Sequence, residues 1–246
     1  MTDNPDVPKT QKAFVPLEND ANVMNDLVHN LGFSQDRGFS DVYSINDADL
    51  LGFVPRPSYA LLLVFPVTPA YEEHRKKEDA TLQEYTGHGP SERVMWFKQT
   101  IRNSCGLIAL LHAVANGDAR THVEEDSDLD KLLRQAQDLE PSRRADLLYD
   151  SKVLESAHAN AANLGGTDAP QADDDVDLHF VAFVKADGQL WELDGRRKGP
   201  LARGPLKDDE DALSETALNL GVRKFIARGM EEGELRFSLV SLSDLF

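Results

Sequence analysis

The sequence is poor in cysteine, in basic residues and in long apolar runs. A single cysteine, Cys105, occurs among 246 residues, so the chain cannot form an internal disulfide. This suits a reducing compartment, and we expect a cytoplasmic protein with access to the nucleus. The longest apolar run, residues 60–67, is interrupted by Pro66 and falls far short of the roughly 18 residues that indicate a spanning helix. Residues 1–12 are polar, so no secretory signal is expected.

The shortage of basic residues makes the chain strongly acidic. Its 26 Lys and Arg residues stand against 43 Asp and Glu residues, for a formal net charge of −17. Phosphate binding needs clustered cations, so we expect no nucleic acid partner, and no apolar segment indicates a membrane partner. An acidic surface speeds encounter with a basic partner, but it also keeps a protein soluble, and net charge fits both interpretations.

The one cysteine precedes a strongly apolar helix. Four residues repeat at the spacing of one buried helix face: Leu107, Leu110, Leu111 and Val114. Asn103 and Ser104 are good N-cap residues, so the helix should begin at or next to Cys105. The unpaired amides and the dipole of a helix start favour a thiolate, and the same amides can hold an oxyanion. The alternative is that Cys105 is a small buried hydrophobe, as lone cysteines often are.

A nucleophilic cysteine also needs an oxyanion donor and a base. Gln99 lies six residues before Cys105, and its amide can donate a hydrogen bond without carrying charge. Among seven histidines, His179 is the best base, because it precedes the apolar run 180–184, which predicts a buried strand. His112 lies on the Cys105 helix but about 10 Å along its axis. The other histidines fall in solvated or helical surroundings: His29, His74, His88 and His122 in the former, His158 in the latter.

A hairpin is expected to bring a carboxylate to His179. Residues 189–196 alternate polar and apolar side chains and follow the turn signal Asp187-Gly188. Because a hairpin returns the end of its second strand to the start of its first, Asp194 should lie close to His179. Asp194 would then orient the imidazole.

Two acidic stretches, residues 126–130 and 173–177, resemble metal-binding loops only superficially. The first has the opening alternation of an EF-hand, but Lys131 stands where the sharp turn needs glycine, so a helix start is the better interpretation. The second is interpreted as a solvated loop. We expect no metal and no other cofactor.

The remaining pattern predicts an α+β fold, with helices packed around a largely antiparallel sheet. The expected helices are one that follows the Asn19-Asp20 cap and others over residues 71–83, 128–137, 143–163 and 211–228. The expected strands cover residues 61–65, 180–184, 190–193 and 235–242. No repeat or linker divides the chain.

Three of these blocks resemble, in order and spacing, the active-site blocks of the ubiquitin C-terminal hydrolases, cysteine deubiquitinases of the papain-like superfamily. They are residues 98–106, the His179-Phe180 strand and residues 192–196. Flanking stretches match as well, at residues 16–19, 54–57, 61–66 and 234–238. The resemblance implies a single catalytic domain over residues 13–246 after a flexible tail at 1–12, with helices on both sides of the sheet and a knotted chain.

The resemblance implies that Cys105 is the nucleophile, His179 the general base and then acid, Asp194 its orienter and Gln99 an oxyanion donor. The implied reaction is hydrolysis of ester, thioester, amide or peptide bonds at the C-terminal glycine of ubiquitin, or of a related ubiquitin-like modifier. Ubiquitin is a suitable basic partner, because its tail carries arginines. The implied ubiquitin contacts are Pro16, Leu17, Glu18, Asn103, Ser104 and Leu178.

The stretch from about residue 157 to 177, rich in Ala, Asn, Gly, Asp and Pro, corresponds to the family's crossover loop, beneath which the ubiquitin tail threads. Such a loop would favour small or unfolded leaving groups, whereas a plain connector is the alternative. Because the chain stops at Phe246, without the C-terminal extension of some relatives, we expect a free-standing monomer.

Two other functions remain open at this point. One is a different acyl-transfer enzyme on the papain-like plan, such as an endopeptidase or a transglutaminase. The other is a non-catalytic module that only binds ubiquitin. The presence of all four polar residues favours the hydrolase.

Overall fold

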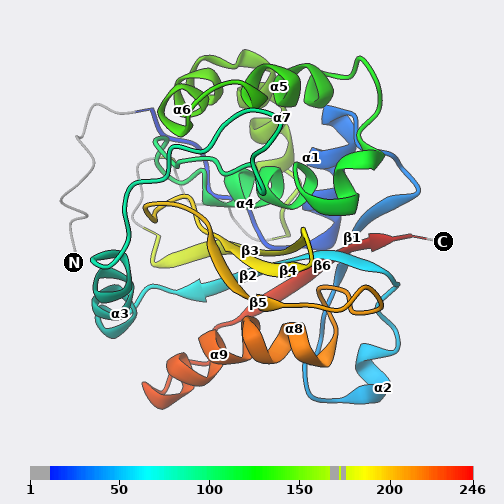
Figure 1. The fold of residues 1–246 in the computed structure, drawn as a ribbon. Helices are drawn as coiled ribbons and strands as arrows, with labels where there is room; N and C mark the ends of the chain where they lie inside the picture. Colours follow the sequence, from blue (N-terminus) through cyan, green and yellow to red (C-terminus); the bar gives the residue numbers. More distant parts are fainter. Residues whose placement is uncertain (1–11, 167–171, 173–175, 246) are drawn as a thin grey trace.

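The computed structural model describes residues 12–166, 172 and 176–245, and shows a central sheet with helices on both faces (Figure 1). The strands are β1 (Arg37–Asp41), β2 (Ser58–Pro66), β3 (Leu178–Ala186), β4 (Gln189–Leu193), β5 (Leu201–Pro205) and β6 (Ser238–Asp244). The helices are α1 (Ala21–Leu31), α2 (Ala48–Leu51), α3 (Pro69–Asp79), α4 (Cys105–Val114), the 3-10 helix η1 (Gly117–His122), α5 (Asp128–Gln137), α6 (Pro141–Asp150), α7 (Lys152–Ala162), α8 (Glu215–Leu220) and α9 (Val222–Glu231).

The predicted α+β class is confirmed. The six strands are ordered β1-β6-β2-β3-β4-β5, and each pairs antiparallel with its neighbours. α1 and α4 to α7 lie on one face, and α8 and α9 on the other (Figure 1). The knotted path and the domain boundary at residue 13 stay predictions, and residues 1–11 of the expected tail lie outside the described residues.

The sheet separates two hydrophobic clusters, and its central strand β2 contributes to both. Side chains alternate along a strand, so Leu62 and Val64 pack beneath α1 and α4, while Leu61 and Leu63 pack toward α8 and α9. This explains why β2 is a continuous apolar run: both of its faces are buried.

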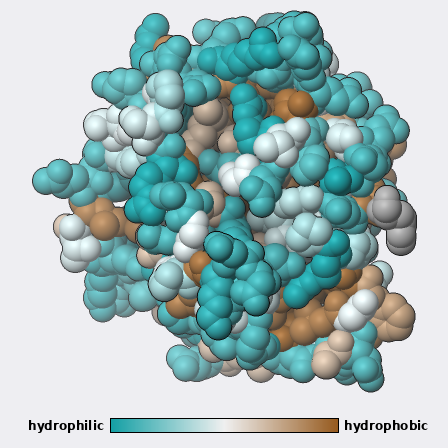
Figure 2. All heavy atoms as spheres, turned by 45° about the vertical axis from the view of Figure 1, so that its right-hand side comes forward, coloured by the Kyte–Doolittle hydropathy of each residue, from teal (hydrophilic) through white to brown (hydrophobic). Residues whose placement is uncertain are grey.

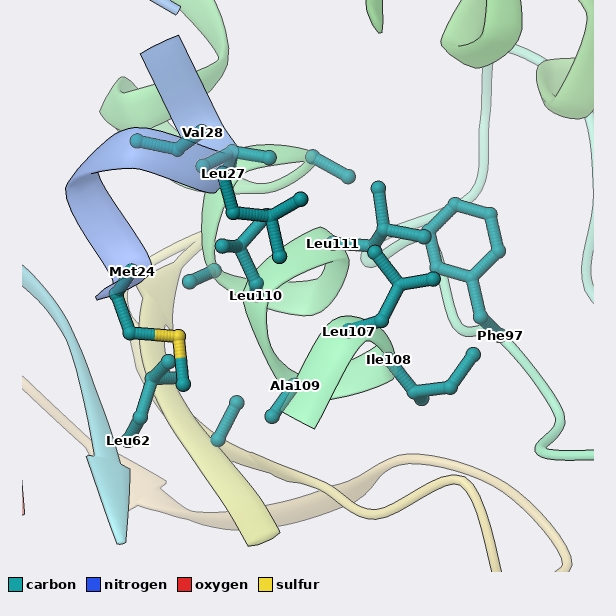
Figure 3. Packing of buried hydrophobic residues seen from close by; sticks show 14 of the residues in the cluster. Met24, Leu27, Val28, Leu62, Phe97, Leu107, Ile108, Ala109, Leu110 and Leu111 are labelled. Atoms are coloured by element: carbon teal, nitrogen blue, oxygen red, sulfur yellow. The ribbon is translucent and has the colours of Figure 1, made fainter. Parts of the chain in front are cut away.

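Helix α4 lies inside the first cluster. All of its residues after Cys105 are buried, as expected of a helix that is apolar all round. Figure 3 shows its contacts in this cluster: Leu107, Ile108, Leu110 and Leu111 pack with Met24, Leu27 and Val28 of α1, Leu62 of β2, and Phe97. Because α4 is enclosed in this way and packs on β3, its N-terminus is held at a fixed place beside the sheet.

Two of the predicted helices are wrong, because each is interrupted. The helix expected over residues 143–163 is divided into α6 and α7 at Ser151, whose extended backbone ends one helix while its hydroxyl accepts from the Leu154 N–H (3.3 Å) and caps the next. The helix expected over residues 211–228 is divided into α8 and α9 at Gly221. A Cβ at Gly221 would lie 2.8 Å from the Phe183 ring, so only glycine allows this close approach to β3.

The outer surface is largely polar on the face shown in Figure 2. Within the described ranges, none of the helices combines the length and apolarity needed to cross a bilayer.

Candidate active site

Cys105 is the first residue of α4, as predicted. Ser104 is the N-cap residue, but its hydroxyl donates to the Ile101 carbonyl (2.8 Å) and does not accept from a helix N–H. The amides of the first turn therefore lack a side-chain cap and can face a thiolate or an oxyanion. Cys105 is half-buried, whereas Gly106 behind it packs so closely that a Cβ would lie 3.1 Å from the Leu17 Cβ. Cys105 is thus not an enclosed core residue.

His179, on β3, lies beside the Cys105 side chain, close enough for the two side chains to act on each other's pKa. Burial raises the pKa of the thiol, but the hydrogen bond and charge of His179, together with backbone hydrogen bonds from Phe180 and Gly106, lower that pKa below its ordinary value. Burial also disfavours the charged imidazole. The charge of Asp194 and the hydrogen bonds to Asp194 and Cys105 outweigh it and raise the pKa of His179 to about 9. The two groups therefore favour a thiolate–imidazolium pair at neutral pH.

The β3–β4 hairpin brings Asp194 back beside His179. The Nε2 atom of His179 lies 2.8 Å from Oδ1 of Asp194, and both side chains are buried. The proximity predicted from the hairpin is confirmed, and it leaves Nδ1 of the ring for the sulfur. Burial alone would raise the pKa of Asp194, but the charge and hydrogen bond of His179 hold that pKa well below its usual range. Asp194 thus stays ionised, while its role in catalysis stays a prediction.

Three groups that hold Asp194 were not expected from the sequence. The Arg196 backbone N–H donates to Oδ1 (2.8 Å), the Trp96 indole donates to the Asp194 carbonyl (3.1 Å), and the Tyr71 hydroxyl donates to Oδ2 (3.3 Å). Only the first carries a local signal, because an Asp often bonds the amide two residues on. Tyr71 and Trp96 lie 123 and 98 residues from Asp194, a separation that no local pattern bridges.

Gln99 is tied to the segment that follows Asp194. Its backbone N–H donates to the Gly195 carbonyl (2.9 Å), and a Cβ at Gly195 would lie only 2.9 Å from the Gln99 Cβ, so glycine is required there. The side-chain Nε2 donates to the Ile101 carbonyl over a long 3.3 Å. An amide nitrogen carries two hydrogens, so Gln99 keeps a donor for an oxyanion. Its role as oxyanion donor stays a prediction.

The residues with predicted ubiquitin contacts differ in exposure. Four of them are half-buried at the surface: Pro16, Glu18, Asn103 and Leu178. Leu17 is 7% exposed and Ser104 fully buried, because the first packs on Gly106 and the second on the loop before α4. In this structure a partner would reach the first four side chains before these two.

The histidines that were set aside are less solvated than expected. Of the four placed in solvated surroundings, only His88 is exposed, and the other three are half-buried. His112 is fully buried and accepts from the Phe97 N–H (2.9 Å), and burial lowers its pKa to about 3. His158 is buried as well, with Nε2 2.7 Å from the Val15 carbonyl. Both buried rings are structural.

The acidic stretch at residues 126–130 forms a helix start, as predicted. Ser127 caps α5 by accepting from the Asp130 N–H (3.1 Å), and Asp130 pairs with Arg134 (2.8 Å). Of the second stretch, residues 173–175 lie outside the described residues. Among the residues that are described, no three His, Cys, Asp or Glu side chains gather as metal ligands would.

The shifted pKa values predict an unusual pH dependence for the single thiol. We expect the iodoacetamide alkylation rate of Cys105 to stay high well below the pKa of an ordinary cysteine, because the His179 charge stabilises the thiolate. We expect kcat/KM to fall as pH rises through about 9, where His179 loses its proton. In His179→Ala the alkylation midpoint should return to about 8.5 or above. A wild-type midpoint equal to that of this variant would contradict the ion pair.

The chain is similar to known proteins in sequence and in fold. Residues 14–227 match the family described as ubiquitin carboxyl-terminal hydrolase, family 1. The chain is 38% identical over 227 residues to ubiquitin carboxyl-terminal hydrolase isozyme L1 of Rattus norvegicus, covering 92% of this chain and 96% of that one. It is 34% identical over 237 residues to ubiquitin carboxyl-terminal hydrolase 3 of Arabidopsis thaliana, covering 95% of each.

A solved structure shares the fold. The crystal structure of the Trichinella spiralis UCH37 catalytic domain bound to ubiquitin vinyl methyl ester superimposes with a TM-score of 0.70, covering 94% of this chain and 95% of that one. The two sequences are 21% identical, so this likeness supports the fold alone.

Proposed function

The chain belongs to family 1 of the ubiquitin carboxyl-terminal hydrolases, which are cysteine-type deubiquitinating enzymes, and we propose that Cys105, His179 and Asp194 catalyse hydrolysis at the C-terminal glycine of ubiquitin. The observation that carries this proposal is the placement of Cys105 beside His179, whose Nε2 lies 2.8 Å from Oδ1 of Asp194. Esters, thioesters, amides and peptides all present the carbonyl that a thiolate attacks.

The proposed reaction has two acyl-transfer steps. The Cys105 thiolate attacks the glycine carbonyl carbon, and the oxyanion accepts hydrogen bonds from the Gln99 side chain and the Cys105 backbone N–H. The His179 imidazolium gives its proton to the leaving group as the carbonyl–leaving-group bond breaks, and a thioester remains. His179 then takes a proton from water, which attacks the thioester and restores the thiolate. Asp194 orients the ring and stabilises its charge throughout.

The charge of the chain supports a basic substrate. The net charge is −17, because 43 Asp and Glu residues stand against 26 Lys and Arg residues. The related UCH37 structure holds ubiquitin vinyl methyl ester. We extend this to ubiquitin, or a related modifier, as the substrate of this chain, with the acidic surface favouring its arginine-bearing tail.

The segment between α7 and β3 is the proposed crossover loop. Helix α7 continues to Ala162, so the loop begins later than the expected position near residue 157. Residues 167–171 and 173–175 lie outside the described residues, but the Ala172 carbonyl accepts from Asn103 Nδ2 (3.0 Å). Since Asn103 is two residues before Cys105, this contact supports a loop beside the nucleophile, and hence a preference for small or unfolded leaving groups.

Lengthening this loop should relax the proposed size filter. A Gly-Ser insertion after Gly166 is expected to raise cleavage of folded ubiquitin conjugates from near zero, while hydrolysis of a small ubiquitin ester keeps its rate. The matched control places the same insertion between Asp208 and Asp209, in an exposed turn between β5 and α8. If folded conjugates stay uncleaved after the loop insertion, the segment is a plain connector.

A substrate comparison tests the function as a whole. The protein is incubated with ubiquitin that carries a C-terminal fluorogenic amide, and separately with unrelated peptides that carry the same fluorophore. We expect turnover of the ubiquitin substrate alone. Comparable turnover of unrelated peptides would instead identify a general papain-like acyl-transfer enzyme. Ubiquitin binding without turnover would identify a non-catalytic module.

A further inference from the structure

The two carboxylate oxygens of Asp194 have different partners. Oδ1 accepts from His179 Nε2 and from the Arg196 backbone N–H, both at 2.8 Å. Oδ2 accepts from the Tyr71 hydroxyl at 3.3 Å, in surroundings where Asp194 is fully buried. A buried carboxylate oxygen that loses its donor is costly, so the carboxylate would rotate or shift to regain one. The hydrogen bond from the Tyr71 hydroxyl to Oδ2 therefore helps to fix the direction in which Oδ1 points.

Tyr71 is itself held firmly in place. Its backbone N–H donates to Thr68 Oγ1 (3.1 Å), the N-cap contact that starts α3. Its ring packs against Phe65, with 4.6 Å between ring centroids, and near Phe225, with 6.0 Å. An aromatic side chain has only two χ angles, so these contacts leave the hydroxyl little freedom.

The same aromatic group supports the histidine. Phe65 lies opposite His179 in the β2–β3 pairing, and the two rings meet edge to face, with centroids 5.9 Å apart. Tyr71 thus touches the catalytic pair along two routes, through Phe65 to the imidazole and directly to the carboxylate. A donor in this position can set the relative orientation of both groups.

The charges around Tyr71 keep it a donor. The charged and titratable groups that face Tyr71 or Asp194 come from α3, α4, β3, β4 with the turn after it, and α9. They are Arg75, His112, His179, Glu192, Arg196, Arg197 and Arg228. Burial, followed by the charges of Asp194 and Glu192, raises the pKa of Tyr71 well above its ordinary value. The phenol therefore keeps its proton over the working pH range.

We propose that Tyr71 is a positioning residue of this hydrolase, whose hydroxyl fixes the rotation of the Asp194 carboxylate so that Oδ1 faces His179 and Nδ1 of the ring faces Cys105. The hydroxyl acts through Asp194 alone, whereas the ring reaches His179 only by way of Phe65 and is kept in the test variant. As a statement about catalysis this inference rests on the proposed function. Its effect on the Cys105 thiol can be measured without ubiquitin.

The test is Tyr71→Phe, which removes the hydroxyl and keeps the ring. We expect kcat toward a ubiquitin ester to fall about 3- to 10-fold with KM unchanged, as for one net hydrogen bond. We also expect the pH midpoint of Cys105 alkylation by iodoacetamide to rise by about half to one unit, because a misaligned Asp194 supports the imidazolium less well. Cys105 is the only cysteine in the chain, so alkylation reports this thiol alone.

The matched control is Tyr59→Phe. The Tyr59 hydroxyl also donates to a carboxylate, Asp244 at 2.5 Å, but on β2 and β6 away from the catalytic groups. The Tyr59→Phe variant should leave kcat and the pH midpoint of Cys105 alkylation unchanged. If Tyr71→Phe leaves both kcat and the pH midpoint of Cys105 alkylation unchanged, the proposal is overturned. It is also overturned if Tyr71→Phe lowers Tm but leaves this midpoint unchanged, because the role of Tyr71 is then merely structural. If the wild-type protein fails to hydrolyse ubiquitin esters while the midpoint still shifts, the proposed function fails and the positioning of Asp194 stands.

Discussion

Replacing Cys105 with alanine should abolish hydrolysis of ubiquitin esters and amides while leaving ubiquitin binding intact. The sulfur is the atom that forms the thioester, and removal of a triad nucleophile typically costs on the order of 10⁵-fold or more in kcat. Alanine keeps the Cβ of the half-buried Cys105 and removes only the sulfur, so the fold should persist. The measurements are kcat with a fluorogenic ubiquitin substrate and the affinity for ubiquitin by calorimetry.

Cys105→Ser provides the matched control for this change. It preserves size, but a hydroxyl is not ionised by His179 as the thiol is, so the variant should be nearly as slow as alanine. Hydrolysis at the wild-type rate by Cys105→Ala, with the fold intact, would refute the nucleophile assignment.

Replacing Gln99 with alanine should lower kcat by about 10²- to 10³-fold, the usual effect of losing one oxyanion donor. KM should change little, because the hydrogen bond from Gln99 to the substrate forms only as the carbonyl oxygen becomes charged. The reason lies in the structure: Gln99 Nε2 makes one long 3.3 Å contact to Ile101, which leaves a donor for the transition state. The measurement is kcat and KM separately, with a ubiquitin ester.

Two controls separate this effect from structural damage. Gln83→Ala removes the same side chain at an exposed position after α3 and should be silent. Alkylation of Cys105 by iodoacetamide should keep its rate and pH profile in Gln99→Ala, since the ion pair with His179 is untouched. A raised KM with unchanged kcat would show instead that Gln99 binds the ground state of the substrate.

The strands that were predicted from the sequence and the strands that were missed lie in different places in the sheet. The apolar runs of β2 and β3 are central strands, buried on both faces, so their composition shows them plainly. The two strands without a prediction, β1 (Arg37–Asp41) and β5 (Leu201–Pro205), are the two edges of the sheet. An edge strand needs less apolar surface and tolerates glycine and proline, so β1 and β5 lack the pattern of a buried strand.

In the site, contacts between residues close in sequence were predictable, whereas contacts between distant residues were not. The approach of Asp194 to His179 was predictable, because a tight hairpin joins residues only 15 apart in sequence. The start of α4 at Cys105 was predictable from the apolar spacing and from the residue types before it, although Ser104 does not cap the helix with its side chain. The contact of Tyr71 with Asp194 was not predictable. It requires α3 to pack beside the end of β4, although Tyr71 and Asp194 are 123 residues apart in sequence.

Buried charges were also beyond prediction from the sequence. Arg197 lies in a polar stretch, yet it is almost fully buried and pairs with Glu78 (2.7 Å) and Asp79 (2.8 Å) of α3 and with Glu192 (3.1 Å) of β4. Long-range pairing makes such burial tolerable. Nothing in the local sequence of Arg197 indicates which carboxylates will surround it.

The most direct test of the account is covalent capture. The protein is incubated with ubiquitin carrying a C-terminal vinyl methyl ester, and the adduct is located by peptide mass spectrometry. The account predicts one ubiquitin per chain on Cys105, formed slowly by His179→Ala and not at all by Cys105→Ala. Binding of the probe without any adduct to the wild-type thiol would contradict it.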